Sequence, residues 1–178
     1  FTGEIDLNID PLCPEQEGKV NQISDMKLYD EYVVFIMQGF PASGKTSFIK
    51  EYVKDNKIKN SLHLSNDTHT KSKLKKAIKK GMEDEAVIFI DNTNATKKNR
   101  KEIIDIVKND KDYNIIGIHI TTSMEMSKAL NKQRYYISNM DNKYKGKKHD
   151  KIPYVAYNVY KSRYEKMKKD EGFNKIIN

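Results

Sequence analysis

Gly39-Phe-Pro-Ala-Ser-Gly-Lys-Thr46 decides the fold, because this octapeptide follows a short apolar run and precedes a helical pattern. It satisfies G-x-x-x-x-G-K-[ST], the pattern of a loop that binds phosphate between a strand and a helix. The glycines let the backbone curl until successive amides point at phosphate oxygens, and the following helix adds its positive N-terminal end. The stretch therefore predicts a phosphate site at the carboxyl end of a strand.

The residues of this P-loop are expected to play distinct roles. Lys45 is placed to hold the β- and γ-phosphates of a nucleotide, and the Thr46 hydroxyl to bind Mg²⁺. A nucleotide and Mg²⁺ are therefore the expected cofactors. The expected nucleotide-binding residues are Gly39, Ala42, Ser43, Gly44, Lys45, Thr46 and Ser47 of the loop, together with Arg134.

Apolar runs and amphipathic stretches alternate around the loop. Runs rich in Val and Ile predict buried strands, and the stretches between them show a helical period. The order predicts an α/β domain of three layers with a parallel sheet, whose ligands lie outside the carboxyl ends of the strands. The expected strands are 32–38, 61–65, 86–91 and 114–121, and the expected helices are 45–55, 70–80, 97–108 and 123–138.

Two further segments frame this domain. Residues 139–151 are rich in lysine and show no apolar period, so we expect a mobile lid, followed by a last helix from Pro153 to about Met167. Residues 1–30 contain two prolines and no sustained period, which predicts an irregular lead-in to a single domain at 31–178. The start at Phe1 suggests a piece of a longer chain.

Net charge, cysteine count and hydrophobicity indicate which partners and which compartment to expect. The 33 basic side chains outnumber the 25 acidic ones and give a net charge of +8, which favours a polyanion partner. A lysine-rich composition can also reflect an AT-rich genome, so charge alone does not identify the partner. A single cysteine, Cys13, forms no internal disulfide and favours a reducing, intracellular compartment. No apolar run approaches the roughly 18 residues needed to span a membrane.

Two aspartates follow strands on the expected phosphate side. Asp67 is placed to orient an attacking hydroxyl and accept its proton, although it could instead be the N-cap of the helix near residue 70. Asp91 follows four apolar residues, as in a Walker B element, and is the expected acidic residue at the metal. Substrate contacts are expected from Asp67, Thr93, Asn94 and Arg100, with Asn94 or Thr96 as the alternative N-cap of the next helix.

Arginine is scarce, because only Arg100, Arg134 and Arg163 occur among the 33 basic residues. A site that uses arginine in such a chain is expected to need a planar fork of donors. Arg134, just before the lysine-rich segment, is the expected transition-state arginine, and Arg100 is an expected contact to substrate phosphates. Either could instead form an ion pair at the surface, and Arg163 is expected to be structural.

Several strings together resemble the kinase domain of the bifunctional polynucleotide kinase 3′-phosphatases. The resemblance covers roughly residues 32–176 and is most specific at IDNTN, at its downstream Arg100 and at the tail from Ile152-Pro153 to Glu171-Gly-Phe173. The matching strings are GFPASGKTSFI (39–49), SNDT (65–68), IDNTN (90–94), NKQR (131–134), IPYVAYNVYKSRYE (152–165) and EGF (171–173).

The resemblance implies a P-loop kinase fold, ATP as the nucleotide, and transfer of its γ-phosphate to a 5′-hydroxyl end of DNA or RNA. It implies that Lys45, Thr46, Asp67, Asp91 and Arg134 have the roles described above, with Asp67 as the general base. It also suggests that residues 1 to about 14 connect to a preceding phosphatase domain.

The sequence departs from the family in one place, because Asn66 stands where animal members have a basic residue that helps to bind the strand. Two alternatives stay open at this point. The chain could be a P-loop kinase of a nucleoside or small metabolite, or a module that binds nucleic-acid ends without catalysis. The complete set of Lys45, Thr46, Asp67, Asp91 and Arg134 argues against the module, since a pure binder needs no base.

Overall fold

The computed structural model describes residues 32–67, 69–109, 112–140, 145–146 and 148–178. The predicted lead-in at 1–30 and its connector therefore lie outside the described residues, as do residues 141–144 and 147 of the predicted lid. No helix within the described ranges is both long enough and apolar enough to cross a membrane.

A parallel sheet of five strands forms the centre, in the order β2-β3-β1-β4-β5. Four strands confirm the sequence prediction, and the fifth was missed because it has only three residues. The strands are β1 (Tyr32–Gln38), β2 (Ser61–Leu64), β3 (Val87–Ile90), β4 (Tyr113–His119) and β5 (Lys175–Ile177).

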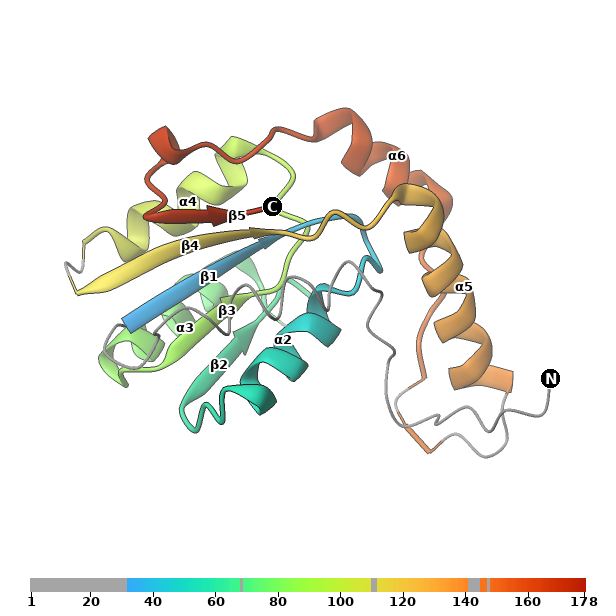
Figure 1. Ribbon diagram of the computed structural model, residues 1–178, viewed down its shortest axis with the longest axis horizontal. Helices are drawn as coiled ribbons and strands as arrows, with labels where there is room; N and C mark the ends of the chain where they lie inside the picture. The colour runs from blue at the N-terminus through green and yellow to red at the C-terminus, as the bar shows by residue number, and fades with distance from the viewer. Residues whose placement is uncertain (1–31, 68, 110–111, 141–144, 147) are drawn as a thin grey trace.

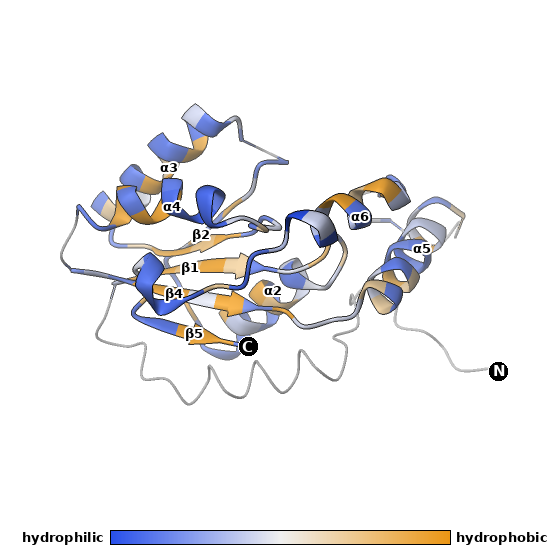
Figure 2. Ribbon diagram, turned by 90° about the horizontal axis from the view of Figure 1, so that it is seen from above, coloured by the Kyte–Doolittle hydropathy of each residue, from blue (hydrophilic) through white to orange (hydrophobic). Residues whose placement is uncertain are grey.

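Helices cover both faces of the sheet, as expected for three layers (Figure 1). Helix α2 (Lys45–Asp55) packs Phe48, Ile49 and Tyr52 against one face. Helices α3 (Lys71–Glu83) and α4 (Lys97–Val107) cover the other face with Ile78 and Ile104 among their buried residues. Figure 2 shows the hydrophobic strands enclosed between these layers. The predicted α/β fold is thus confirmed.

An arm of two helices extends beyond the carboxyl ends of the strands (Figure 1). Helix α5 (Met124–Met140) and helix α6 (Tyr154–Arg163) make up this arm. Asn131 of α5 forms two hydrogen bonds with the backbone of Ile152, two residues before α6. Helix α6 ends four residues before the predicted Met167, and a short 3₁₀ turn, η1 (Lys169–Glu171), precedes β5. Ligands of such sheets bind outside the carboxyl ends of the strands, which is the side that the arm borders.

Candidate phosphate site

The P-loop joins the end of β1 to the start of α2. Ala42 and Gly44 adopt positive φ angles of 55° and 92°, and Gly44 is the N-cap of α2. At Gly39 a Cβ atom would lie 2.8 Å from Ser43 Oγ and 3.1 Å from Ile120 O, so no larger residue fits without a shift. The loop therefore turns its backbone inward at the N-terminal end of a helix, which is the arrangement that binds phosphate.

The arm and the sheet both support the loop. Thr122 Oγ1 donates to Ser43 O at 3.0 Å. The Phe40 ring lies 4.5 Å from that of Tyr160 and 6.4 Å from that of Tyr157, both on α6. Burial raises the pKa of Tyr160, which keeps its phenol neutral against the loop. The position of the P-loop is thus fixed by contacts from the arm as well as from β1.

Lys45 lies folded back onto the loop and is only 7% exposed. Its Nζ donates to Phe40 O at 2.6 Å and to Gly39 O at 3.2 Å. Burial lowers the pKa of Lys45 to about 8, against the opposing attraction of Asp91 and Asp67, while the charge of Arg134 lowers it further. Asp91, Asp67 and Arg134, the charged residues that the sequence predicts at this site, therefore all lie close enough to influence the pKa of Lys45.

Asp91 lies just after β3 and faces the P-loop. Its Oδ2 accepts a hydrogen bond from Thr46 Oγ1 at 2.5 Å and another from His63 Nε2 at 2.8 Å. Burial acts to raise the pKa of Asp91, but the hydrogen bond from His63, the charge of Lys45 and the hydrogen bond from Thr46 hold it below its ordinary value. The carboxylate is therefore ionised at neutral pH.

The Thr46 hydroxyl and the Asp91 carboxylate fit a magnesium ion. Both are oxygen ligands, and Mg²⁺ is usually held by one or two carboxylates, water and the substrate's phosphates rather than by a full protein cage. Among the described residues, no group of three or more His, Cys, Asp or Glu side chains is arranged to hold a metal ion. These two residues would hold the ion beside the phosphates on the loop.

His63 is the residue of this site that sequence reasoning missed. It lies on β2, next to β3, and its contact with Asp91 follows from the pairing of Leu64 with Ile90 in the parallel register. The string SLHLS could have indicated it, because His63 alternates with apolar residues in a strand that ends at the phosphate side.

Asp67 lies in an exposed turn after β2. The Asp67 amide donates to Ser65 Oγ at 3.2 Å, and the neighbouring Asn66 amide donates to Asn92 Oδ1 at 2.7 Å, which ties this turn to the one after β3. The N-cap of α3 is Thr70, so the alternative role of Asp67 as a helix cap is wrong. Its role as the general base stays a prediction.

Arg134 lies on α5 and contributes positive charge at both Lys45 and Tyr157. Its Nε is buried and has no hydrogen-bond partner within the described part of the chain. A buried donor without an acceptor is costly, and an anionic group bound on the P-loop side would supply that acceptor. The role of Arg134 as the lid arginine stays a prediction.

Arg100 does not reach a substrate surface, so the expected phosphate contact is wrong. The side chain is completely buried and forms two hydrogen bonds of 2.8 Å with Glu171, from Nε and from Nη2. Its Nη1 donates to the backbone oxygens of Asn94 and Glu165 at 3.0 and 2.9 Å. The guanidinium group of Arg100 is therefore part of the core, where it joins α4 to the C-terminal segment.

Asn94 is also committed to the backbone. It is 3% exposed, and its Nδ2 donates to Met37 O at 2.7 Å. The N-cap of α4 is Thr96, whose side chain accepts from the Asn99 amide at 3.1 Å, so of the two alternative caps Thr96 is confirmed. Asn94 therefore fixes the turn after β3 against β1, and a substrate contact through its amide nitrogen is not expected.

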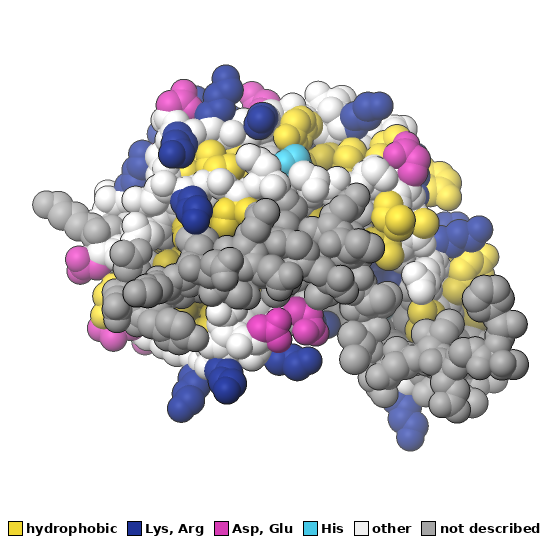
Figure 3. All heavy atoms as spheres, in the orientation of Figure 1, with side chains coloured by type: hydrophobic (Ala, Val, Ile, Leu, Met, Phe, Trp, Pro, Cys, Tyr) yellow, Lys and Arg dark blue, Asp and Glu magenta, His cyan; other side chains and the backbone are white. Residues whose placement is uncertain are grey.

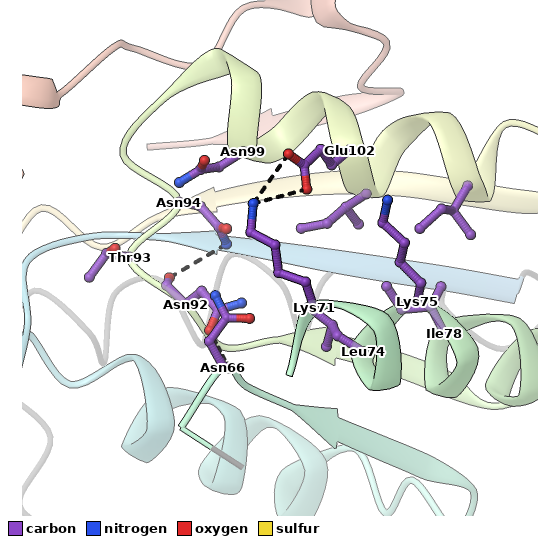
Figure 4. A pocket seen from close by; sticks show the side chains of 12 residues that line it. Asn66, Lys71, Leu74, Lys75, Ile78, Asn92, Thr93, Asn94, Asn99 and Glu102 are labelled. Atoms are coloured by element: carbon purple, nitrogen blue, oxygen red, sulfur yellow. Dashed lines mark hydrogen bonds and ion pairs between the residues drawn. The ribbon is translucent and has the colours of Figure 1, made fainter. Parts of the chain in front are cut away.

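A cleft opens beside these turns, between α3 and α4 (Figure 4). Asn66, Asn92 and Thr93 form its end nearest the P-loop, so the expected contact residue Thr93 does line an open surface. Lys71 spans the cleft from α3, with its Nζ 3.4 Å from both carboxylate oxygens of Glu102 on α4. Leu74, Ile78, Ile103 and Ile106 line the apolar part.

The face drawn in Figure 3 carries side chains of several kinds. Basic side chains lie mostly around its edge, and hydrophobic side chains appear along the top and at the right, over the arm. The exposed apolar residues of the arm include Met126, Met140, Tyr154 and Val155.

Comparison with known proteins matches this architecture. A curated protein of Schizosaccharomyces pombe, named bifunctional polynucleotide phosphatase/kinase, is 30% identical over 80% of this chain and 32% of its own length. A protein of Acanthamoeba polyphaga mimivirus, named putative bifunctional polynucleotide phosphatase/kinase, is 27% identical over the same shares. The chain thus spans about a third of the length of these relatives, and the resemblance seen in the sequence is confirmed.

Two solved structures share the fold. A fungal RNA kinase superposes with a TM-score of 0.59 at 16% identity, covering 82% of this chain and 74% of that one. Chaetomium thermophilum Kti12 in complex with ADP-AlF3 superposes with a TM-score of 0.55 at 14% identity, covering 82% and 88%. The model of the family described as "Chromatin associated protein KTI12" matches residues 33–173, and the chain accordingly belongs to the KTI12 family.

Proposed function

We propose that this chain transfers the γ-phosphate of ATP to a 5′-hydroxyl end of a DNA or RNA strand. The observation that best supports the proposal is the convergence of charge on Lys45, whose ammonium interacts with Asp91, Asp67 and Arg134 together. Phosphates on the P-loop would then have the metal-side carboxylate of Asp91, the base Asp67 and the guanidinium group of Arg134 around them. This is the set of groups that phosphoryl transfer uses.

Nucleotide binding would begin with a change of partners at the loop. Lys45 Nζ would leave Gly39 O and Phe40 O and bind the β- and γ-phosphate oxygens, which offer a stronger, charged acceptor. Thr46 and Asp91 would hold Mg²⁺, which when bound shields the charge of the same phosphates. The buried Nε of Arg134 would gain an acceptor on the transferred group.

The transfer itself needs one proton acceptor. The oxygen of the 5′-hydroxyl attacks the γ-phosphorus, Asp67 accepts the hydroxyl proton, and the bond from the γ-phosphorus to the β,γ-bridging oxygen breaks to release ADP. Lys45 and Arg134 stabilise the charge that develops on the oxygens of the transferred group. Asp67 suits this role because its turn is exposed and can meet an incoming strand.

The cleft between α3 and α4 is the proposed path for the acceptor end. Its inner end is formed by Asn66, which directly precedes Asp67, and by Thr93, which follows Asp91 by two residues. The names of the S. pombe and mimiviral relatives support a polynucleotide as the acceptor.

A second candidate is nucleotide-dependent binding of a partner without transfer to a polynucleotide. It is supported by membership of the KTI12 family, whose description names no kinase activity. In that case ATP would bind to the same P-loop, and its γ-phosphate would be retained or released to water.

A labelling experiment separates these candidates. The chain is incubated with γ-labelled ATP and Mg²⁺, and with 5′-hydroxyl DNA, 5′-hydroxyl RNA, 5′-phosphorylated DNA or free nucleosides. We expect label on the 5′-hydroxyl strands alone, and no label with Lys45→Met, which removes the phosphate contact. Label on nucleosides alone would overturn the proposal in favour of a metabolite kinase, and free phosphate or intact ATP in every reaction would favour the second candidate.

A further inference from the structure

His63 is bound to the carboxylate that faces the metal, yet none of the steps above involves it. Its Nε2 lies 2.8 Å from Asp91 Oδ2, and its side chain is 38% exposed whereas that of Asp91 is 8% exposed. The imidazole therefore approaches a nearly buried carboxylate from the solvent side, at the open edge of the site.

The direction of this hydrogen bond follows from the two atoms involved. A carboxylate oxygen accepts hydrogen bonds, so His63 Nε2, which lies 2.8 Å from Asp91 Oδ2, is the donor. A neutral imidazole with its proton on Nε2 is sufficient for this contact. Both donors, His63 and Thr46, bind the same oxygen, Oδ2, which leaves Oδ1 as the second ligand atom.

The backbone holds His63 in this position. The Asp91 amide donates to Leu64 O at 2.8 Å, which continues the parallel pairing of β2 with β3 one residue past Ile90. His63 and Asp91 are thus placed by the same ladder of hydrogen bonds. A shift of either strand end that moved the His63 ring away from Asp91 would break these backbone hydrogen bonds.

We propose that His63 is a positioning residue for magnesium, which fixes the rotamer of Asp91 so that the carboxylate meets the ion beside the nucleotide. The proposal rests on the nucleotide site of the proposed function, but not on its acceptor. Thr46 would also contact the ion through its hydroxyl oxygen, whereas His63 acts as a donor to Asp91. Partners that orient ligand side chains in this way typically contribute 10–100-fold to metal affinity.

The test measures magnesium dependence rather than turnover. Binding of a fluorescent, non-hydrolysable ATP analogue to the whole chain is titrated in EDTA and then at increasing Mg²⁺. We expect His63→Leu to raise the Mg²⁺ concentration at half-effect by about 10–100-fold and to leave the affinity in EDTA unchanged. His63→Gln, which keeps an amide donor on the strand, should restore most of the response.

His119→Leu is the matched control. His119 is also a strand histidine with partial exposure, on β4, and it stacks on Tyr164 at 5.5 Å instead of binding Asp91. This variant should show the wild-type magnesium response.

Three results would overturn the proposal. They are a wild-type magnesium response in His63→Leu, an equal loss of affinity with and without metal, and a failure of His63→Gln to recover any response. A wild-type chain that binds no nucleotide would overturn this proposal and the proposed function together. Binding with a clear effect of His63, but without transfer to strands, would remove only the polynucleotide acceptor.

Discussion

Arg100 and Glu171 form a buried, two-pronged ion pair that joins the first turns of α4 to the segment before β5. Both side chains are almost completely buried, at 0% and 3% exposure. An ion pair of this kind is costly to break from one side, because the remaining charge stays in the interior without a partner.

We therefore predict that Glu171→Gln lowers the free energy of unfolding by about 3–5 kcal/mol. Urea unfolding at neutral pH measures this change. Asp105→Asn is the control, since Asp105 pairs with Lys101 at the exposed surface of α4 and such pairs contribute roughly 0–1 kcal/mol. Equal stability of the two variants would contradict a structural role for the buried pair.

Asp67→Asn is expected to separate the base from every other role. The substitution keeps the size of the side chain in an exposed turn, so thermal melting and nucleotide binding should not change. Single-turnover transfer to a 5′-hydroxyl strand should fall by about 10²–10⁴-fold, the usual effect of losing a general base. A folded variant that binds nucleotide and transfers at the wild-type rate would remove Asp67 from the mechanism.

Arg134→Lys is expected to impair transfer by about 10²–10³-fold, because a point charge cannot reproduce the donors of a planar fork. The measurement is the single-turnover rate at saturating nucleotide. Arg163→Lys, an exposed change on α6, is the control and should leave the rate unchanged. If both variants transfer normally, the buried Nε of Arg134 has no function in the reaction.

The pKa of Lys45 predicts a proton linkage. In the free chain burial lowers this pKa to about 8, and bound phosphates would raise it because they favour the ammonium form. Nucleotide binding near pH 8.5 should therefore take up a proton, and affinity should fall as the pH rises above about 8. Calorimetry in two buffers of different ionisation enthalpy measures the uptake, which should vanish in Lys45→Arg.

The same shift has a consequence for stability. Because the folded state releases the Lys45 proton at a lower pH than the unfolded state, the unfolded state binds more protons between pH 8 and 10.5. The contribution of Lys45 to the free energy of unfolding should therefore rise with pH across this window. The opposite slope in wild type relative to Lys45→Arg would show that the ammonium is not buried.

The sequence predicted those features that depend on local pattern. The P-loop, the strand before it and Asp91 after β3 could be recognised because each lies within a few residues of its own structural context. Arg100 was misjudged for the opposite reason: its partner Glu171 lies 71 residues away, and scarcity of arginine does not distinguish a phosphate contact from a buried ion pair.

His63 and β5 show the same limit. The contact of His63 with Asp91 depends on β2 and β3 being neighbours in the sheet. The order of strands in a sheet cannot be predicted from the alternation of residues within one strand. Strand β5 is a three-residue run whose pairing with β4 is set by the turns before it, including Asn174, whose Oδ1 accepts from the Ile115 amide at 2.7 Å. Non-local contacts decided both features.

The helical arm is fastened at both of its ends to the phosphate loop and the strand before it. Thr122, before α5, donates to Ser43 O, and Glu165, after α6, accepts at its carbonyl from Gln38 Nε2 at 3.0 Å. Any swing of the arm has its pivot at these two points. A displacement of α5 and α6 about these points would be smallest beside the phosphate loop and would grow with distance from it along the two helices.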